Sequence, residues 1–308
     1  MKVGSAIREG FSVTRRARTG IWVLFLVNLG LAALAALPIY RGILGFTGHS
    51  LMTRELLRGF STDWFTDFTM ARPGAWDNYA ATIANFGLLS ILVNALLVGG
   101  VLAHFRKPHL PQGPFAFFRD ARNYAWRMVR LMLIGLCCYW LVFLVLHEGL
   151  TRLTRRWTVA ALDDRPVFWI NLAVSLVTLA GVIFVNLVID YARVMLVLEE
   201  ESSAVAAFLS SLGFSLHRLR KVLAVYAVPS LLGIAPLGIY RLVVPWSSIN
   251  ASLGSPAWSH LREPLVLALL FFGQQVVMWS RYWFRVATWA SEWSYCSRHH
   301  RQVAEKRF

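Results

Sequence analysis

The sequence predicts an all-α membrane protein, a polytopic helix bundle with about six transmembrane helices and basic amphipathic helices in the membrane interface. The first observation is composition: 57% of the 308 residues are hydrophobic, only 15% are charged, and the mean hydropathy is +0.53. A soluble fold cannot hide that much apolar surface, whereas a bilayer accepts it as lipid-facing surface. The second observation is that charged residues are spaced so as to leave six apolar stretches, each long enough or nearly so to span the hydrocarbon.

We expect one transmembrane domain over residues 1–308. The first 18 residues are basic and resemble the start of a signal peptide, but the uncharged run that follows is longer than a signal sequence needs, so a retained anchor is expected. Gly233, Pro236 and Gly238 can break or bend the fifth span. The spans are expected near 19–40, 82–105, 128–149, 166–189, 222–240 and 264–284.

The distribution of lysine and arginine predicts the orientation. The N-terminus, the second and fourth connections and the C-terminus lie on one side and hold 21 of the 31 basic residues. The positive-inside rule makes that side cytoplasmic. We therefore expect a multi-pass protein of a bacterial inner (plasma) membrane with both termini in the cytoplasm, an outer loop at 41–81 and a cytoplasmic basic tail at 286–308.

A helix over residues 202–221 is expected to lie in the inner interface. Its apolar residues, among them Val205, Leu209 and Leu216, fall on one face at helical spacing, and Ser202 or Ser203 can cap its start. Basic segments also precede the first and third spans, and Gly10-Phe11-Ser12 repeats as Gly213-Phe214-Ser215. The pattern predicts three units of interfacial helix, span, outer loop and span.

The basic residues of these segments are the candidate contacts for lipid. Anionic headgroups are the simplest partner for cations beside apolar stretches, so membrane lipids are expected as partners and nucleic acid is not. A protein partner or a second copy of the chain is the alternative partner for this surface. The candidates are Arg15, Arg16, Arg18, Arg119, Arg122, Arg127, Arg218, Arg220 and Lys221.

Polar residues inside the spans are a second set of candidates. Hydrogen bonding between helices is the ordinary explanation for them, and a path for a transported molecule is the alternative. The set comprises Asn94, Asn171, Ser175, Thr178 and Gln274.

No catalytic, cofactor or metal site is expected. His147-Glu148 begins a zinc-helix pattern, but Thr151 stands where its second histidine would fall. Asp63 and Asp67 share a helical face with Trp64 and Phe68 nearby, which indicates a helix within the outer loop. Cys137, Cys138 and Cys296 match no metal motif and are expected to be packing residues or spare thiols.

The stretch from Tyr191-Ala192-Arg193 to Val197-Leu198-Glu199, continued by Ala206, Ser211 and Arg218 to Lys221, resembles bacterial six-span inner-membrane proteins of unassigned function. It is also similar to the membrane domain attached to some glycerophosphodiester phosphodiesterases. Asp63-Trp64, Asp67-Phe68 and Gly99-Gly100 resemble the first half of the uncharacterised six-span proteins. The resemblance implies a six-helix bundle and no established catalytic residue. The catalytic domain of those enzymes is missing from this sequence, so their activity is not implied.

The sequence therefore favours a non-enzymatic membrane protein that acts as a scaffold or as a lipid-contacting partner of another protein. The alternative is a transporter or permease-like subunit that moves a small or amphipathic molecule.

Overall fold

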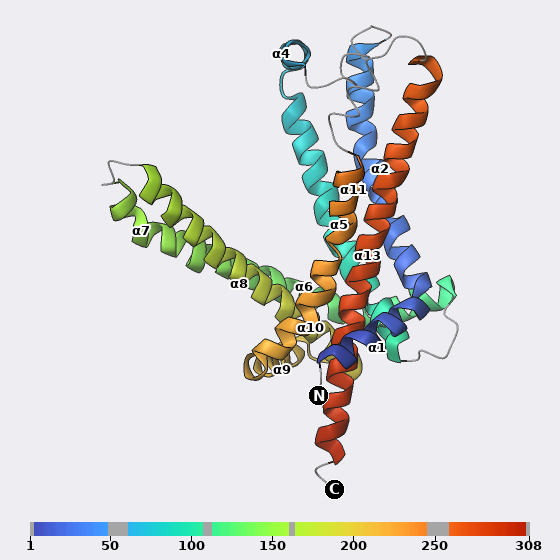
Figure 1. Cartoon of the computed structure of the whole chain (residues 1–308), viewed down its shortest axis with the longest axis vertical. Coiled ribbons are helices and arrows are strands. Elements are labelled where there is room, and N and C mark those ends of the chain that lie inside the picture. The colour runs from blue at the N-terminus through green and yellow to red at the C-terminus, as the bar shows by residue number, and fades with distance from the viewer. Residues whose placement is uncertain (1–2, 49–60, 107–112, 160–163, 245–258, 306–308) are drawn as a thin grey trace. The chain divides into compact units, whose positions relative to one another are not determined.

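The computed structural model describes residues 3–48, 61–106, 113–159, 164–244 and 259–305 (Figure 1). All elements in these ranges are helices and none is a strand, which confirms the all-α prediction. Five of the described helices are long and apolar enough to cross a membrane, so the chain is a multi-pass membrane protein. They are Arg18–Thr47, Ala75–Arg106, Pro114–Arg155, Arg165–Leu198 and Leu219–Val243.

These helices contain the first five predicted spans. The predicted sixth span, near 264–284, lies within helix α13 (Ser259–Glu305), part of which falls outside the described side chains, and it stays a prediction. The fifth span is interrupted, as its glycines and prolines suggested: α10 (Leu219–Leu232) ends just before Gly233, and α11 (Ala235–Val243) follows. The third span, α6 (Pro114–Val142), continues through one π-helical turn, η1 (Phe143–Glu148), into α7 (Gly149–Val159).

The chain divides into two compact units, each built from separated segments. Unit 1 comprises Met1–Ala17, Ala95–Pro229 and Val286–Phe308, and unit 2 comprises Arg18–Asn94 and Ser230–Arg285. Helices α5 (Ala75–Arg106) and α13 are each divided between the two units, with one part of the helix in unit 1 and the other part in unit 2.

Unit 2 contains α2 (Arg18–Thr47), α4 (Thr62–Ala71), most of α5, α11 and the first part of α13. The predicted outer loop is shorter than expected, because α2 continues to Thr47 and α5 already begins at Ala75. The predicted loop helix is present as α4, capped by Ser61, with Trp64 and Phe68 buried on its inner face. Those two rings pack with Phe46 of α2, with centroids 6.3 and 5.2 Å from it.

Unit 1 contains α1 (Val3–Arg16), the end of α5, α6 with its continuation through η1 to α7, α8 (Asp164–Leu198), α9 (Ala204–His217), α10 and the end of α13. Figure 1 shows α6 and α7 running beside α8 as one long pair. The most continuous buried stretches are the last turns of α8 and residues 286–296 of α13.

Each helix predicted to be interfacial packs on a long helix at a contact where at least one of the two helices has a small residue. A Cβ on Gly10 of α1 would lie 2.6 Å from the backbone nitrogen of Ser291 in α13. One on Gly100 of α5 would lie 2.9 Å from the carbonyl oxygen of Phe117 in α6. In α9, the Ser211 hydroxyl donates to the carbonyl of Val188 in α8 over 3.0 Å.

These contacts follow a cyclic order. Helix α6 packs on the span that precedes it, α9 packs on α8, and α1, which opens the chain, packs on the last long helix, α13. The order agrees with three repeated units. The repeated sequence Gly-Phe-Ser does not occupy equivalent positions in α1 and α9, however. Gly10 is buried against Ser291, whereas a Cβ on Gly213 would meet no atom within 4 Å.

Two predicted boundaries were wrong. The interfacial helix expected over 202–221 ends at His217, and residues 219–221 already belong to α10. The segment 286–308 is not simply a basic tail, because α13 continues through it and residues Val286, Ala287, Ala290 and Cys296 are fully buried. Small side chains recur through this stretch, so neighbouring helices can approach α13 closely.

Candidate functional site

The predicted lipid-contact cations lie at the starts and ends of the interfacial helices. Arg15 and Arg16 close α1 and Arg18 opens α2, where unit 2 begins. Three others lie in the first turns of α6 and three around the junction of α9 and α10. All nine are exposed except Arg127, which is half-buried.

Helix α9 is the segment that the sequence predicts to lie in the membrane interface. Of the two serines that could cap it, Ser203 does so, because its side chain accepts a hydrogen bond from the Ala206 amide at 3.3 Å. Its inward face is made of small residues and its predicted apolar stripe faces outward. The inward residues are Ala204, Ala207, Ser211 and Ser215.

The exposed stripe of α9 is strongly apolar. Val205, Leu209 and Leu216 are each more than half exposed, at 56%, 59% and 57%. Three large aliphatic side chains on one open face are costly in water and favourable in the acyl region of a bilayer. The stripe and the basic residues that follow it therefore form one amphipathic surface.

The basic end of this surface is tied to α13. The Arg218 guanidinium lies 5.7 Å from the centroid of the Phe214 ring, and its Nη1 is 3.1 Å from His299 Nδ1. Phe214 in turn contacts Tyr191 of α8 and Tyr295 of α13, with ring centroids 5.8 and 5.9 Å apart. Arg218 is thus held over an aromatic cluster, while Arg220 and Lys221 extend the positive surface beyond it.

The cations of α6 differ among themselves. Arg119 and Arg122 are exposed, whereas Arg127 donates to the backbone carbonyl of Glu200 at 3.4 Å. The carboxylate of Glu200 forms an ion pair with Arg106 of α5. Glu200 has a φ of 53°, a left-handed conformation that is strained for a non-glycine residue, so these contacts fix the sharp turn between α8 and α9.

Behind this surface lies a buried charged group that sequence reasoning missed. Asp190 is fully buried and accepts hydrogen bonds from Arg193 at 3.0 Å and from the indole nitrogen of Trp289 at 3.2 Å. Glu292, one turn after Trp289, is also fully buried. The pairing joins α8 to α13 through charge-assisted contacts in a region with little water, where such contacts are strong.

A signal for this group was present in the sequence. Residues 286–297 contain one acidic residue and no basic one, and Ala287, Ala290, Ser291 and Ser294 recur at helical spacing. Small residues at that spacing indicate a helix packed on its neighbours. The buried end of α13 was overlooked because basic residues flank it on both sides.

The polar residues inside the spans have different hydrogen-bond partners. Asn94 exchanges hydrogen bonds with Asn28 of α2 at 2.8 and 2.9 Å, and Ser90 donates to Asn28 at 2.9 Å. Asn28 was missed as a partner. Ser175 and Thr178 donate to carbonyls of their own helix, and Asn171 and Gln274 are exposed. Bonds within and between helices thus account for Asn94, Ser175 and Thr178.

Among the described residues no three histidine, cysteine or acidic side chains are grouped as a metal site would need. Of the three cysteines, Cys137 is exposed, Cys138 is half-buried and Cys296 is buried. Burial in the core of unit 1 raises the pKa of the Cys296 thiol well above its usual value, and the nearby Glu292 adds to the shift. A thiol in that state is a packing group and a poor nucleophile.

No protein-family model matches the chain, and no curated protein or solved structure is significantly similar to it. The resemblance to six-span proteins and to phosphodiesterase membrane domains therefore rests on the motifs alone.

Proposed function

We propose that the chain is a non-enzymatic protein of a bacterial inner membrane whose basic interfacial helices bind anionic lipid on the cytoplasmic side. In this role it acts as a scaffold, or as a lipid-contacting partner of another protein. The observation that carries the proposal is the amphipathic surface of α9. Its small-residue face packs on α8, its apolar stripe is open, and Arg218, Arg220 and Lys221 follow directly.

The physical argument combines two terms. Each large aliphatic side chain transferred from water into the acyl region contributes roughly 1.5–3 kcal/mol. Each cation near an anionic leaflet contributes about 1 kcal/mol, and this term weakens as salt rises. The apolar stripe thus sets the depth of the helix, and the cations set its preference for anionic lipid.

The test is lipid selectivity around the full chain in vesicles of phosphatidylcholine that contain spin-labelled phosphatidylglycerol or spin-labelled phosphatidylcholine. We expect the anionic label to associate more strongly with the protein, and the preference to fall in high salt. The triple variant R218Q/R220Q/K221Q should reduce it.

The matched control is R41Q/R72Q/R152Q, which removes the same charge from the opposite, predicted outer side. This control variant should leave unchanged the preference for spin-labelled phosphatidylglycerol over spin-labelled phosphatidylcholine in the inner leaflet. Equal association of both labels with the unaltered chain would overturn the proposal.

A further inference from the structure

Helix α1 carries two unlike surfaces. Ala6, Gly10 and Thr14 recur every four residues and are buried. The opposite side carries two adjacent rows, one of small and apolar residues at 4, 7 and 11, and one of polar residues at 8, 12 and 15. Residues three and four apart are neighbours on a helix surface, so each row is continuous.

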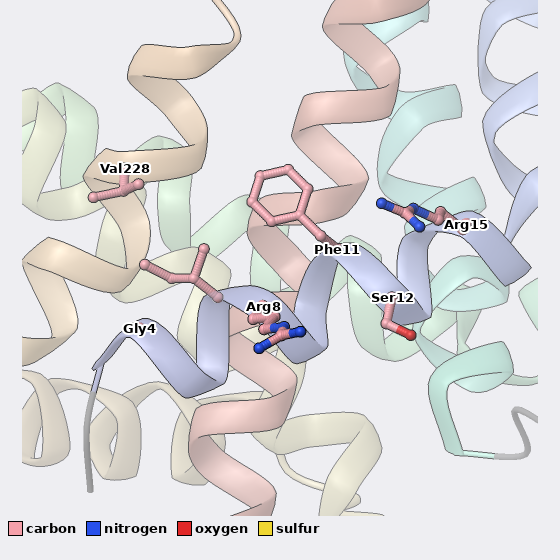
Figure 2. Close-up of a pocket in the computed structure, with 7 residues that line it drawn as sticks. Gly4, Arg8, Phe11, Ser12, Arg15 and Val228 are labelled. Atoms are coloured by element: carbon pink, nitrogen blue, oxygen red, sulfur yellow. The ribbon is translucent and has the colours of Figure 1, made fainter.

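Both rows line a hollow of about 700 Å³ within unit 1, to which α10 adds one residue (Figure 2). That volume lies in the range of pockets that hold small molecules. Figure 2 shows Phe11 rising from α1 on the side where Val228 lies, with Arg8 and Arg15 before and after it along the helix. The lining residues are Gly4, Ile7, Arg8, Phe11, Ser12, Arg15 and Val228.

The charge of the hollow is positive. It is lined by two arginines and by no acidic residue. The nearest carboxylate in sequence, Glu9, is ion-paired with Arg298 of α13. The hollow is thus lined by two arginines and Ser12, whose side chains are of the kind that bind anions, and by an apolar strip made by Ile7, Phe11 and Val228.

We infer that this hollow binds one phospholipid with an anionic phosphodiester headgroup. Arg8, Ser12 and Arg15 receive the phosphate, since guanidinium groups form strong charge-assisted hydrogen bonds with phosphate oxygens. The apolar strip receives the first part of an acyl chain. This strip selects a lipid over free phosphate, which would leave it uncovered. The inference rests on the proposed function and adds to it a single saturable site.

The test is a titration of the full chain, purified in a neutral detergent, with phosphatidylglycerol, followed by native mass spectrometry. We expect one lipid to be retained per chain, and no retention of phosphatidylcholine with the same acyl chains. The variant R8Q/R15Q should weaken the retained complex by about tenfold or more, the loss expected for charge-assisted hydrogen bonds. V228W, which narrows the strip without changing charge, should weaken it as well.

The matched control is R119Q/R122Q, which removes the same charge from exposed positions of α6 outside the hollow. It should lower the general preference for anionic label in vesicles and leave the single retained lipid unchanged. If the preference persists but no single lipid is retained, the hollow is not a lipid site while the proposed function stands. Retention that survives in R8Q/R15Q, or that inorganic phosphate abolishes at equal concentration, would also overturn the inference.

Discussion

The two halves of α8 differ in how much of their apolar surface is exposed. In the first half, Phe168, Trp169 and Leu176 are 56% to 65% exposed. In the second half, Leu187, Tyr191 and Leu196 are fully buried beside the charged Asp190. Large apolar side chains are thus exposed in the first half, whereas the second half buries its apolar side chains together with a charged one.

Helix α13 repeats the contrast. Leu269, Phe272 and Val276 are more than 60% exposed, whereas Thr288, Ser291 and Glu292 are at most 1% exposed. Lipid solvates the apolar halves, so they need no protein partner. The other halves contain charged or polar side chains that need partners in the protein, and α1 and α9 pack on these halves through small residues.

The largest expected loss in the free energy of unfolding comes from breaking the buried ion pair between Arg193 and Asp190. Arg193→Ala leaves the carboxylate of Asp190 buried without the guanidinium that lies 3.0 Å away. Removal of one partner from a buried ion pair costs about 3–5 kcal/mol. We expect a loss of that size in the free energy of unfolding, measured by denaturant titration of the full chain in detergent.

The control for this prediction is Arg152→Ala, which breaks the exposed pair that Arg152 of α7 forms with Glu148 of η1. Exposed pairs of this spacing contribute about 0.3–0.5 kcal/mol, so little change is expected. Equal losses in the two variants would show that the ends of α8 and α13 do not form a buried core.

A smaller effect is expected from the contact between α1 and α13. Gly10→Ala places a Cβ 2.6 Å from the backbone nitrogen of Ser291, so one of the helices must shift. Overpacking of this kind costs about 1–3 kcal/mol, and the thermal unfolding midpoint should fall accordingly. Gly213→Ala on α9 meets no atom within 4 Å and should be neutral or stabilise by up to about 1 kcal/mol through helix propensity. A neutral Gly10→Ala variant would show that α1 is not packed on α13.

The smallest change in the free energy of unfolding is expected from the hydrogen bonds between Asn94 and Asn28 inside the predicted spans. Asn94→Ala removes the reciprocal hydrogen bonds with Asn28. Hydrogen bonds between transmembrane helices contribute about 0.6 kcal/mol on average and at most about 1.7, so the unfolding free energy should fall by that order. Asn171→Ala, at an exposed position of α8, serves as the control and should change it by less. A loss as large as that of Arg193→Ala would contradict the contrast between the two regions.

The contrast also explains what could be predicted from the sequence. Hydrophobicity locates the segments that lipid solvates, and the first five spans were found on that basis. The cap at Ser203 and the helix at Thr62–Ala71 were predicted from local chemistry. The buried end of α13 was missed because its burial depends on helices distant in sequence, and its polar residues resemble a solvated tail. For the same reason, the pairing of Asp190 with Trp289 could not be predicted from spacing.

The central claim is that α9 lies in the membrane interface with its apolar stripe in lipid. The direct test places a spin label at Leu209→Cys in a full chain whose native cysteines are replaced by alanine, and measures its accessibility to oxygen and to a polar nickel reagent in anionic vesicles. The account predicts that oxygen reaches the label readily and nickel poorly, with a depth just below the headgroups. Ready access to nickel, as for a label in water, would contradict it.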